Sequence, residues 1–550
     1  MSASSTPTEA PRRLDARALA GPAMLVGLLV VAAALRLPDL ATRGTWDADQ
    51  GHDMLVLREL VRHGSIPLLG PPTSIGDFHH GAWYYFLLAP AAWLGGAGDQ
   101  PLAVVLAIAL AGIAAVGVTW WLGRSIAGPI AGAVAGLAMA VSTAAVDEST
   151  FIWNPNLIAL SSSIALAGAW RAWTTRRARW WLLAAVGTAI TMQCHVLGSV
   201  LLPVIVALFV ADLRRTTPGE PRSALWRVAA GSVGIFLVAY APLVLHEVTT
   251  GGLELRAAAD YVLGGSGGSD VALPARLGIV GLRVVSWPLV GLITDGFVAA
   301  VVATCVIVAI VAWRWRAPDA DERLAVRWLG LGLGWSALAL TVAAPSLASV
   351  VAGLPNDHYH AFADPMVFVL LGIGVAGLVA AATGAPRKPL PAVLSAVVIA
   401  AVLGWNLTHQ PPAVHPDGGF PAAAEAADQV EGALATAGIG PQDLVALRSL
   451  PVFKSTEAMA YPLVRLGQAV DAATPQGGAP GNASTGPAVG HPAALVLLCD
   501  DLFRDAIGAP CGGPAESGVT PDAGGSAWGP LLLRLQAHPG RWVSVYPAAP

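Results

Sequence analysis

The sequence predicts a polytopic α-helical membrane protein, with about eleven transmembrane helices and a small α/β domain at its C-terminal end. Of its 550 residues, 55% are hydrophobic and 12% are charged, whereas about 25% are charged in an ordinary soluble domain. The mean hydropathy is +0.62. Long apolar runs fill the chain as far as residue 407, and the residues after it have a soluble character. This composition excludes a disordered chain and a plain soluble enzyme, and the net charge of -4 supplies no basic field for nucleic acid.

The transmembrane helices are predicted from the length of the apolar runs. A helix that crosses a bilayer needs about 20 predominantly apolar residues. Eleven runs approach that length, near 19–37, 101–123, 128–146, 155–173, 180–195, 197–213, 226–245, 296–313, 328–350, 365–384 and 389–407. The fifth and sixth runs are short and share a boundary at His195.

Basic residues predict the orientation. With eleven spans, all the basic clusters fall on the side of the N-terminus: Arg12, Arg13 and Arg17; Arg124; Arg176, Arg177 and Arg179; Arg214, Arg215, Arg222 and Arg227; Arg314, Arg316, Arg323 and Arg327; and Arg387 and Lys388. Positive residues favour the cytoplasmic side. We therefore expect a multi-pass plasma-membrane protein with residues 1–18 in the cytoplasm. Residues 19–407 form the transmembrane domain, and residues 408–550 form an extracytoplasmic domain.

The extracytoplasmic domain, residues 408–550, shows the pattern of a small α/β fold. Buried strands are predicted at 443–451 and 493–501, and helices at 457–470 and 501–508. A Gly/Pro/Ala-rich stretch, 474–490, predicts a flexible loop. Cys499 and Cys511 lie on the outer side, where oxidation is permitted, and we expect them to form a disulfide.

Ionisable residues are almost absent from the spans and gather at their outer ends. A proton-coupled transporter normally carries ionisable residues near the midplane. The sequence thus favours chemistry at the outer membrane surface on a lipid-linked substrate. Two rivals stay open: a flippase for lipid-linked saccharides, which would need a polar path through the bundle, and a non-enzymatic scaffold with an outer binding domain.

The first outer loop, residues 38–100, is the richest segment. Asp47 and Asp49 precede a stretch, 54–64, whose apolar face and charged face are typical of a helix lying in the membrane interface. The aromatic stretch 81–96 is too short for a span and predicts a second interfacial helix. Asp47 and Asp49 are candidates for substrate chemistry, and the alternative is a solvated loop with an N-cap aspartate.

This loop resembles the first outer loop of the GT-C membrane glycosyltransferases, specifically family 39, which includes protein O-mannosyltransferases and lipid A aminoarabinose transferases. Asp49-Gln50 stands where that family has an Asp-Glu pair, and Arg58-Glu59 follows at the family's offset. The stretch 78–86 is in register with the family's Phe-x-Lys-Pro-Pro-Leu-Tyr-Tyr-Trp-like motif. Two departures are that Gln50 replaces an acid and that His80 replaces a lysine resembling a phosphate ligand. The first puts a metal role of that position in doubt, and the second implies a different donor or pH dependence.

The resemblance implies the GT-C fold and transfer of a sugar from a polyprenyl-phosphate donor to an outer-face acceptor, with inversion at the anomeric carbon. Such a reaction needs a carboxylate to accept the acceptor's proton, for which Asp49 is the candidate. It also needs groups that stabilise the departing phosphate, and His79 and His80 are candidates, as cations or as neutral donors. The alternative for both histidines is an interfacial cap on the aromatic helix.

The second outer loop adds four candidates. Asp147 could orient the acceptor or share a divalent cation with Asp49, so such a cation stays open as a cofactor, although no metal ligand set is assigned. Glu148, Trp153 and Asn154 are candidates for substrate binding, since Trp and Asn make good sugar platforms. The alternatives are a polar cap at the end of a span and an ordinary interfacial tryptophan anchor.

The remaining candidates lie in later outer segments. His195 belongs to the lipid-phosphate site or is a buried histidine satisfied by a carbonyl. In loop 351–364, His358 and Tyr359 are candidate donor contacts by resemblance. A metal there is disfavoured because Asp357, His358 and His360 cannot easily converge within one helical turn. Arg256 and Arg283, in loop 246–295, are the guanidinium candidates for phosphate, or are simply solvated.

The expected partners are a polyprenyl-phosphate sugar, membrane lipids and a glycan, lipid or protein acceptor in the cell envelope. The residue usage is typical of a GC-rich bacterium.

Overall fold

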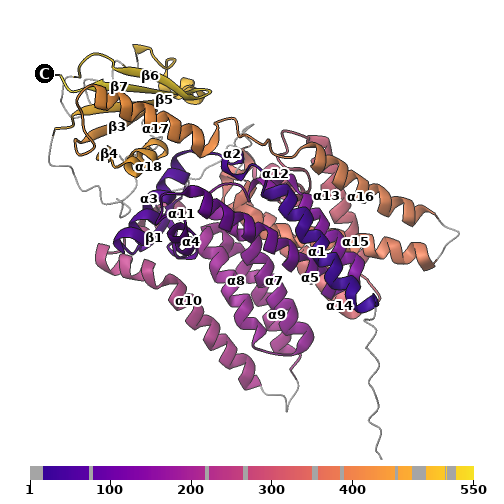
Figure 1. Ribbon diagram of the computed structural model, residues 1–550. Helices are drawn as coiled ribbons and strands as arrows, with labels where there is room; N and C mark the ends of the chain where they lie inside the picture. Colours follow the sequence, from indigo (N-terminus) through magenta and orange to yellow (C-terminus); the bar gives the residue numbers. More distant parts are fainter. Residues whose placement is uncertain are drawn as a thin grey trace, which may run out of the picture.

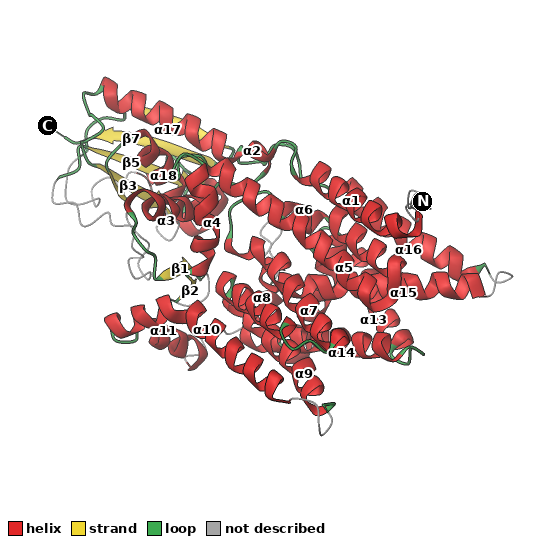
Figure 2. Ribbon diagram, turned by 60° about the horizontal axis from the view of Figure 1, so that its bottom comes forward, coloured by secondary structure: helices red, strands yellow, loops and turns green. Residues whose placement is uncertain are grey.

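A helical part and a sheet-containing domain make up the molecule (Figure 1). The computed structural model describes residues 16–73, 78–216, 222–263, 271–349, 357–384, 389–451, 456–472, 491–514, 516 and 528–549. The sheet domain lies at one end of the helical part, over α3 and α4, and strands are few outside it (Figure 2). Among the basic residues used for orientation, Arg12, Arg13, Arg387 and Lys388 lie outside the described residues.

Each predicted span falls on an observed helix. In the described chain, eight helices are long and apolar enough to cross a membrane. The helices that carry the predicted spans are α1 (Ala16–Arg36), α5 (Pro101–Val141), α7 (Ile158–Thr175), α8 (Trp180–Cys194), α9 (Leu201–Arg214), α10 (Arg222–Thr250), α13 (Phe297–Arg314), α14 (Ala320–Ala343), α15 (Asp364–Gly384) and α16 (Leu390–Thr408). The multi-pass membrane fold predicted from hydropathy is confirmed.

Helix α5 carries two of the predicted spans. Its backbone leaves helical geometry at Ala127 and Gly128, just before Pro129. Gly128 has φ +84°, a left-handed conformation that glycine adopts without strain. A Cβ on Gly132 would overlap Trp120 and Arg124 of the first half. The two halves are therefore packed closely against each other, as two consecutive spans joined by a tight turn would be.

One predicted boundary is wrong by about two turns. The apolar run predicted a span at 328–350, whereas α14 covers Ala320–Ala343. Its start is set by Asp319, whose side chain accepts a hydrogen bond from the backbone N–H of Glu322. The helix ends at Ala343, and the chain continues from Pro345 in the short helix η3 (Pro345–Ala348). Polar first turns of this kind extend a helix beyond its apolar run.

Contacts between helix ends sort the loops into two groups. At one end, Arg36 donates to the carbonyls of Met139 and Ala140, and Asn406 donates to Leu289. At the other end, Arg215 donates to the carbonyl of Trp173 and Arg314 pairs with Glu322. The first group holds the loops predicted to be outside and the second those predicted to be inside. The alternation of the spans is thus consistent, and the absolute orientation remains a prediction.

The predicted outer loop 246–295 contains two helices, α11 (Leu253–Leu263) and α12 (Leu273–Val290). Although α12 is long enough to span, Arg276 donates to the carbonyl of Thr341 and Trp287 donates to Glu148. Both partners belong to the outer group of loops. Helix α12 therefore runs along the outer surface of the bundle and does not change the span count.

The first outer loop holds both predicted interfacial helices. Its elements are α2 (Leu40–Arg43), α3 (Ala48–His63), β1 (Leu69–Pro72), β2 (His79–Gly81) and α4 (Trp83–Leu94), with β1 antiparallel to β2. The start expected for the first helix is wrong, because α3 begins before the amphipathic stretch 54–64. Asp49 consequently lies in the first turn of α3 and not ahead of the helix. The cause is again an N-cap, here Asp47.

Short helices mark the other outer segments. They are α6 (Thr143–Asp147), η1 (Asn154–Leu157), η2 (Val196–Val200) and η4 (Asp357–Ala363). The part of loop 351–364 at residues 351–356 lies outside the described residues. These short elements connect spans at the outer end of the bundle and carry most of the candidate site residues.

The C-terminal domain is built on a five-stranded sheet with strand order β4-β3-β5-β7-β6. Its strands are β3 (Val445–Leu450), β4 (Val470–Ala472), β5 (Ala494–Asp500), β6 (Leu533–His538) and β7 (Arg541–Pro547). Strand β3 is parallel to β4 and β5, and β7 is antiparallel to β5 and β6. Helices α17 (Gly419–Thr436) and α18 (Glu457–Leu466) bury apolar side chains against the sheet. The predicted α/β class is confirmed.

The elements predicted in this domain are recovered with small differences. Strands 443–451 and 493–501 correspond to β3 and β5. Helix 457–470 ends early, at Leu466, because Gly467 adopts φ +95° and closes the helix. The segment 501–508 forms η5 (Asp501–Phe503) and α19 (Arg504–Ile507). The predicted flexible loop 474–490 lies outside the described residues.

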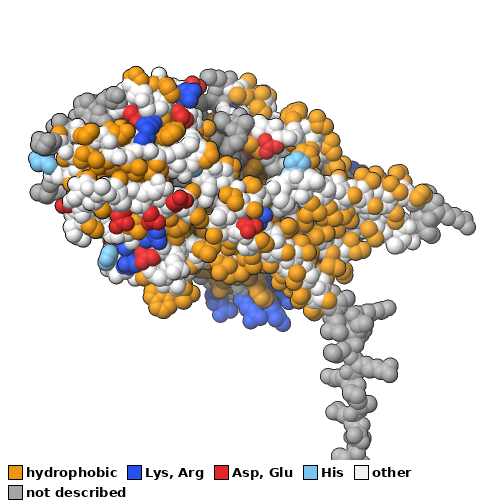
Figure 3. Space-filling view, turned by 45° about the horizontal axis from the view of Figure 1, so that its top comes forward, with side chains coloured by type: hydrophobic (Ala, Val, Ile, Leu, Met, Phe, Trp, Pro, Cys, Tyr) orange, Lys and Arg blue, Asp and Glu red, His pale blue; other side chains and the backbone are white. Residues whose placement is uncertain are grey.

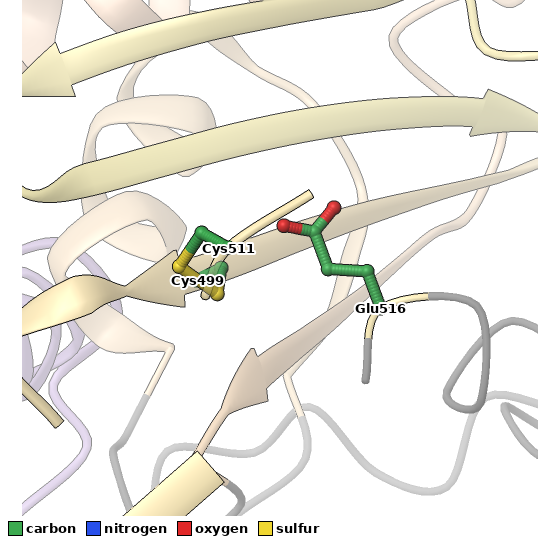
Figure 4. A group of neighbouring side chains, drawn as sticks. All are labelled: Cys499, Cys511 and Glu516. Carbon is green, nitrogen blue, oxygen red and sulfur yellow. A yellow bond between two sulfur atoms is a disulfide. The ribbon is translucent and has the colours of Figure 1, made fainter. Parts of the chain in front are cut away.

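The predicted disulfide between Cys499 and Cys511 is present, with the Cα atoms 5.7 Å apart (Figure 4). It joins the end of β5 to the segment after α19. Charged side chains are frequent over the sheet domain, whereas apolar side chains dominate much of the helical surface in the same view (Figure 3). This division fits a helical part surrounded by lipid and a domain in water.

We expect reporter fusions to show an exported C-terminus. Eleven spans place residue 550 on the side opposite residue 1, so a periplasmic-type reporter should be active after Pro550, whereas a fusion after Arg177, between α7 and α8, should be active only with a cytoplasmic reporter. The opposite pattern at both sites would invert the orientation.

Candidate active site

Five candidate residues converge in a ring cluster, formed by His80, Trp153, His195, His358 and Tyr359. The cluster lies at the end of the bundle that holds the loops predicted to be outside. The ring centroids of His80 and His195 are 4.5 Å apart, and His195 stacks on Tyr359 at 4.5 Å. His358 lies 3.6 Å from Trp153 and 4.3 Å from Tyr359. The members come from β2, from the segment before η1, from the α8–η2 junction and from η4. Sequence segments more than 250 positions apart thus build one site.

His80 is a neutral hydrogen-bond donor in this cluster. Burial holds its pKa well below the usual value, and the neighbouring His195 and His79 lower it further. The backbone N–H of Val196 donates to Nδ1 of His80 at 3.3 Å. In a neutral imidazole only one nitrogen carries a proton, so the proton lies on Nε2. His80 can therefore donate through Nε2 to an oxygen of a ligand, without adding a positive charge.

His79 is held away from the ring cluster by a buried glutamate. Its Nδ1 lies 3.0 Å from Oε1 of Glu254, and its backbone N–H donates to Oε2 at 2.6 Å. Burial alone would raise the pKa of Glu254, but the contacts with His79 outweigh it and lower that pKa. His79 thus fastens β2 to α11.

The two arginine candidates are placed differently. Arg283 is 1% exposed and donates to both carboxylate oxygens of Asp357, at 2.7 and 2.6 Å. It also donates to the carbonyl of Leu347. Since Asp357 begins η4, Arg283 supports the element that carries His358 and Tyr359. Arg256 is exposed and donates to the carbonyl of Gly251, so the structure does not bring it into the cluster.

The second outer loop is tied to the same place. Asn154 is buried and donates to the carbonyl of Cys194, which places Trp153 near His195.

Glu148 accepts a hydrogen bond from Trp287, and burial raises the pKa of its carboxyl to about 8. Burial likewise raises the pKa of Asp147 to about 6, against the charges of His415 and Arg43. His415 lies between α16 and α17, and Arg43 lies in α2, so the charges that act on Asp147 come from these two segments.

The exposed side chain of Asp49 lies in the first turn of α3, which is closed by a capping box. The Asp47 side chain accepts from the backbone of Gln50, while Oε1 of Gln50 accepts from the backbone N–H of Asp47. The Gln50 amide also donates to the carbonyl of Ile152 at 2.8 Å, one residue before Trp153. The turn that bears Asp49 therefore adjoins the ring cluster. A glutamate at position 50 would have no proton to donate when ionised, which gives the departure at Gln50 a physical reason.

A second group of ionisable residues on α3 was not predicted from the sequence. Asp53 is 1% exposed and accepts from the hydroxyls of Tyr84 and Tyr85 at 2.7 and 2.9 Å. Burial raises the pKa of Asp53 to about 7. His52 contacts Glu457 of α18 at 2.8 Å. The partners are 405 positions apart, so no local pattern could have indicated the pair.

Among the described residues, one group of potential metal ligands converges: Cys499, Cys511 and Glu516. The two cysteines are joined in a disulfide (Figure 4). Glu516 pairs with Arg534. These atoms are therefore engaged within the protein. Asp357 pairs with Arg283 and His360, which fits a support for η4 better than a metal site.

Comparison with known proteins supports the resemblance seen in the first outer loop. Residues 80–244 match the family described as dolichyl-phosphate-mannose-protein mannosyltransferase. The chain is similar to the crystal structure of ArnT from Cupriavidus metallidurans bound to undecaprenyl phosphate, with 15% identity and TM-score 0.58, over 96% of this chain and 98% of that one. For ArnT in the apo state the identity is 14% and the TM-score 0.56, over the same shares. No curated protein matches at a significant level. The predicted resemblance to GT-C glycosyltransferases and the GT-C fold are confirmed.

The His52–Glu457 pair should make stability depend on pH. Burial alone would lower the pKa of His52, but Glu457 raises it to about 9. Since this folded pKa exceeds the unfolded value of about 6.5, the stabilisation is fully present below about pH 6.5 and is lost as pH rises through about 9. Wild type should therefore melt above His52→Gln at pH 6, and the difference in Tm should vanish near pH 10. An unchanged difference would contradict the pairing.

The Arg283–Asp357 pair should show strong coupling. Removing one member of a buried ion pair leaves an unpaired buried charge and typically costs about 3–5 kcal/mol. We expect Arg283→Met or Asp357→Leu to lower the Tm strongly, and the double variant to be less destabilised than the sum of the two. Additive losses in the thermal melts would show that the residues act independently.

Proposed function

We propose that this chain, which has the polytopic GT-C fold, transfers a sugar from a polyprenyl-phosphate donor to an acceptor at the outer face of the plasma membrane, with inversion at the anomeric carbon. The observation that carries the proposal is the convergence of His80, Trp153, His195, His358 and Tyr359 beside the turn that bears Asp49. ArnT, which has the same fold, binds undecaprenyl phosphate in its crystal structure. The site therefore suits a phosphate-linked lipid donor.

In the proposed reaction Asp49 is the general base. An ionised carboxylate accepts the proton of the acceptor hydroxyl while the oxygen attacks the anomeric carbon, and the bond from that carbon to the phosphate oxygen breaks. Asp49 is exposed at the start of α3, so an acceptor from the aqueous side can reach it. The helix N-terminus also favours the ionised carboxylate. Asp147, on α6, is proposed to orient the acceptor.

The ring cluster is proposed to hold the donor. Nε2–H of His80 donates to a phosphate oxygen, and such a donor stabilises the negative charge that the leaving phosphate gains. Trp153 and Tyr359 are half-buried and present ring faces, which suit the apolar faces of a sugar. His195, His358 and Asn154 complete and orient this surface. His79 is proposed to act indirectly, since its contact with Glu254 fixes β2 and thereby His80.

A divalent cation remains part of the proposal only as an alternative. Carboxylate oxygens of Asp49 and Asp147 would be its ligands, and the cation would supply charge stabilisation at the leaving phosphate. Addition of a chelator tests this alternative directly, because it should leave transfer unchanged if His80 and its neighbours suffice.

We expect Asp49→Asn to lower transfer by about 10²–10⁴-fold, the usual contribution of a general base. The side chains are nearly isosteric, so folding and expression should be unchanged. The measurement is transfer by purified protein in liposomes, with a panel of polyprenyl-phosphate sugars. Asp39→Asn is the matched control, because Asp39 is exposed in the same loop and its left-handed backbone, φ 54°, also suits Asn.

The control variant should transfer sugar at the wild-type rate. Equal activity of Asp49→Asn and Asp39→Asn would reject Asp49 as the base. Wild-type protein that moves lipid-linked saccharide across the bilayer, without forming a glycosylated product, would instead favour a flippase.

A further inference from the structure

Helix α3, which carries Asp49, is held by side chains of the C-terminal domain at two positions, Asp47 and His52. Arg541 of β7 donates through Nη2 to Oδ1 of Asp47 at 2.7 Å and to Oδ2 of Asp500 at 3.1 Å. Asp47 is the N-cap of α3 and lies two positions before Asp49. His52, on the next turn, contacts Glu457 of α18. The first turn of α3 is therefore fixed from both of its ends by side chains that belong to the other domain.

Close backbone packing reinforces these polar contacts. A Cβ on Gly51 would overlap the carbonyl of Glu457, so α18 lies directly on the backbone of α3 at this position. Trp46, just before the N-cap, donates through its indole N–H to the carbonyl of Ala458 at 2.9 Å. Ala458 and Tyr461 of α18 are buried in the same apolar core as Met54 and Leu57 of α3. The two domains thus share one core at α3.

We infer that the C-terminal domain positions the base of the transfer reaction, with Arg541 as the positioning residue and Gly51 as the contact that lets α18 seat on α3. This inference rests on the proposed function for its kinetic consequence. Arg541 does not need to touch the substrate. It acts through Asp47, whose capping of α3 sets the direction in which the first turn presents Asp49.

Burial makes the Arg541 contact effective. The side chain of Arg541 is 10% exposed, so the charge pair is shielded from water more than a surface pair would be. Two carboxylates, one from each domain, share this one guanidinium. Loss of Arg541 would leave Asp47 and Asp500 facing each other as like charges, which would push the N-terminus of α3 away from the sheet.

The test uses full-length protein in liposomes and the variant Arg541→Gln. Because a misplacement of about 1 Å can cost 10²-fold in rate, we expect kcat to fall by roughly 10- to 100-fold while the donor KM stays near the wild-type value. Arg541→Lys should restore part of kcat, since a single nitrogen makes both contacts. Arg534→Gln is the matched control, because Arg534 lies on the neighbouring strand and pairs with Glu516 inside the domain.

Hydrogen exchange gives a readout that does not depend on activity. Backbone amides at residues 51–57 of α3 should exchange faster in Arg541→Gln than in Arg534→Gln, while the amides of β5 stay protected in both. Gly51→Ala should have the same effect on α3, although alanine is the better helix former, because the added methyl group pushes α18 away.

The outcomes separate the two proposals. Equal exchange and equal kcat in Arg541→Gln and Arg534→Gln would overturn the positioning role. A selective rise in exchange at α3, with no transfer by the wild type from any donor, would uphold the coupling of the domain to α3 and reject the proposed reaction. A general loss of protection in β5 would show that Arg541 only stabilises its own domain, which also overturns the inference.

Discussion

The bilayer forbids unpaired polar groups among the helices, and this constraint decides where chemistry can be placed in the molecule. The spans carry few ionisable side chains, so the polar groups that could act on a substrate gather where the helices end. Helix ends alone are poor scaffolds, since each presents only a few residues before the chain turns. The outer site is therefore assembled from many short segments, and each segment needs its own support. The Arg283–Asp357 pair supports η4, Asn154 supports the segment before η1, and Glu254 supports β2.

These supporting contacts explain why several residues predicted to bind a ligand contact other parts of the protein instead. Arg283 and His79 are ionisable, lie in loops predicted to be outside and have residue types suited to phosphate. Their nearest partners are buried carboxylates on other segments. A buried guanidinium with no partner would cost several kcal/mol, so the pairing is the expected fate of such a residue once its helix is covered. From the sequence alone, a supporting arginine and a ligand-binding arginine look identical.

Features that depend on residues close together in the chain could be predicted from the sequence, whereas contacts between distant segments could not. Apolar run length gave the spans, and the grouping of arginines gave their alternation, because both depend on neighbours in the chain. The boundary of α14 was missed because an N-cap, Asp319, extends the helix beyond its apolar run. Tyr359 was a candidate donor contact only through the resemblance to a family, and the packing of His80 and Tyr359 against His195 was not predicted. The contacts of α3 with α18 were not predicted at all, since His52 and Glu457 are 405 positions apart and neither lies in a recognisable motif.

The neutrality of His80 fits the rest of this site. A lysine ammonium at the same position would be buried next to the rings of His195 and His79, and neither ring supplies a compensating negative charge. Burial of a cation in such surroundings is costly, whereas a neutral imidazole keeps a donor at Nε2 and gives up its Nδ1 to Val196. The charge of a bound phosphate would then be met by hydrogen bonds, because the buried guanidinium of Arg283 is already paired with Asp357. The His80–Val196 hydrogen bond and the Arg283–Asp357 pair are both formed without a ligand. Stabilisation of a leaving phosphate would therefore require little reorganisation of the site. Neutral hydrogen-bond donors are effective under this condition.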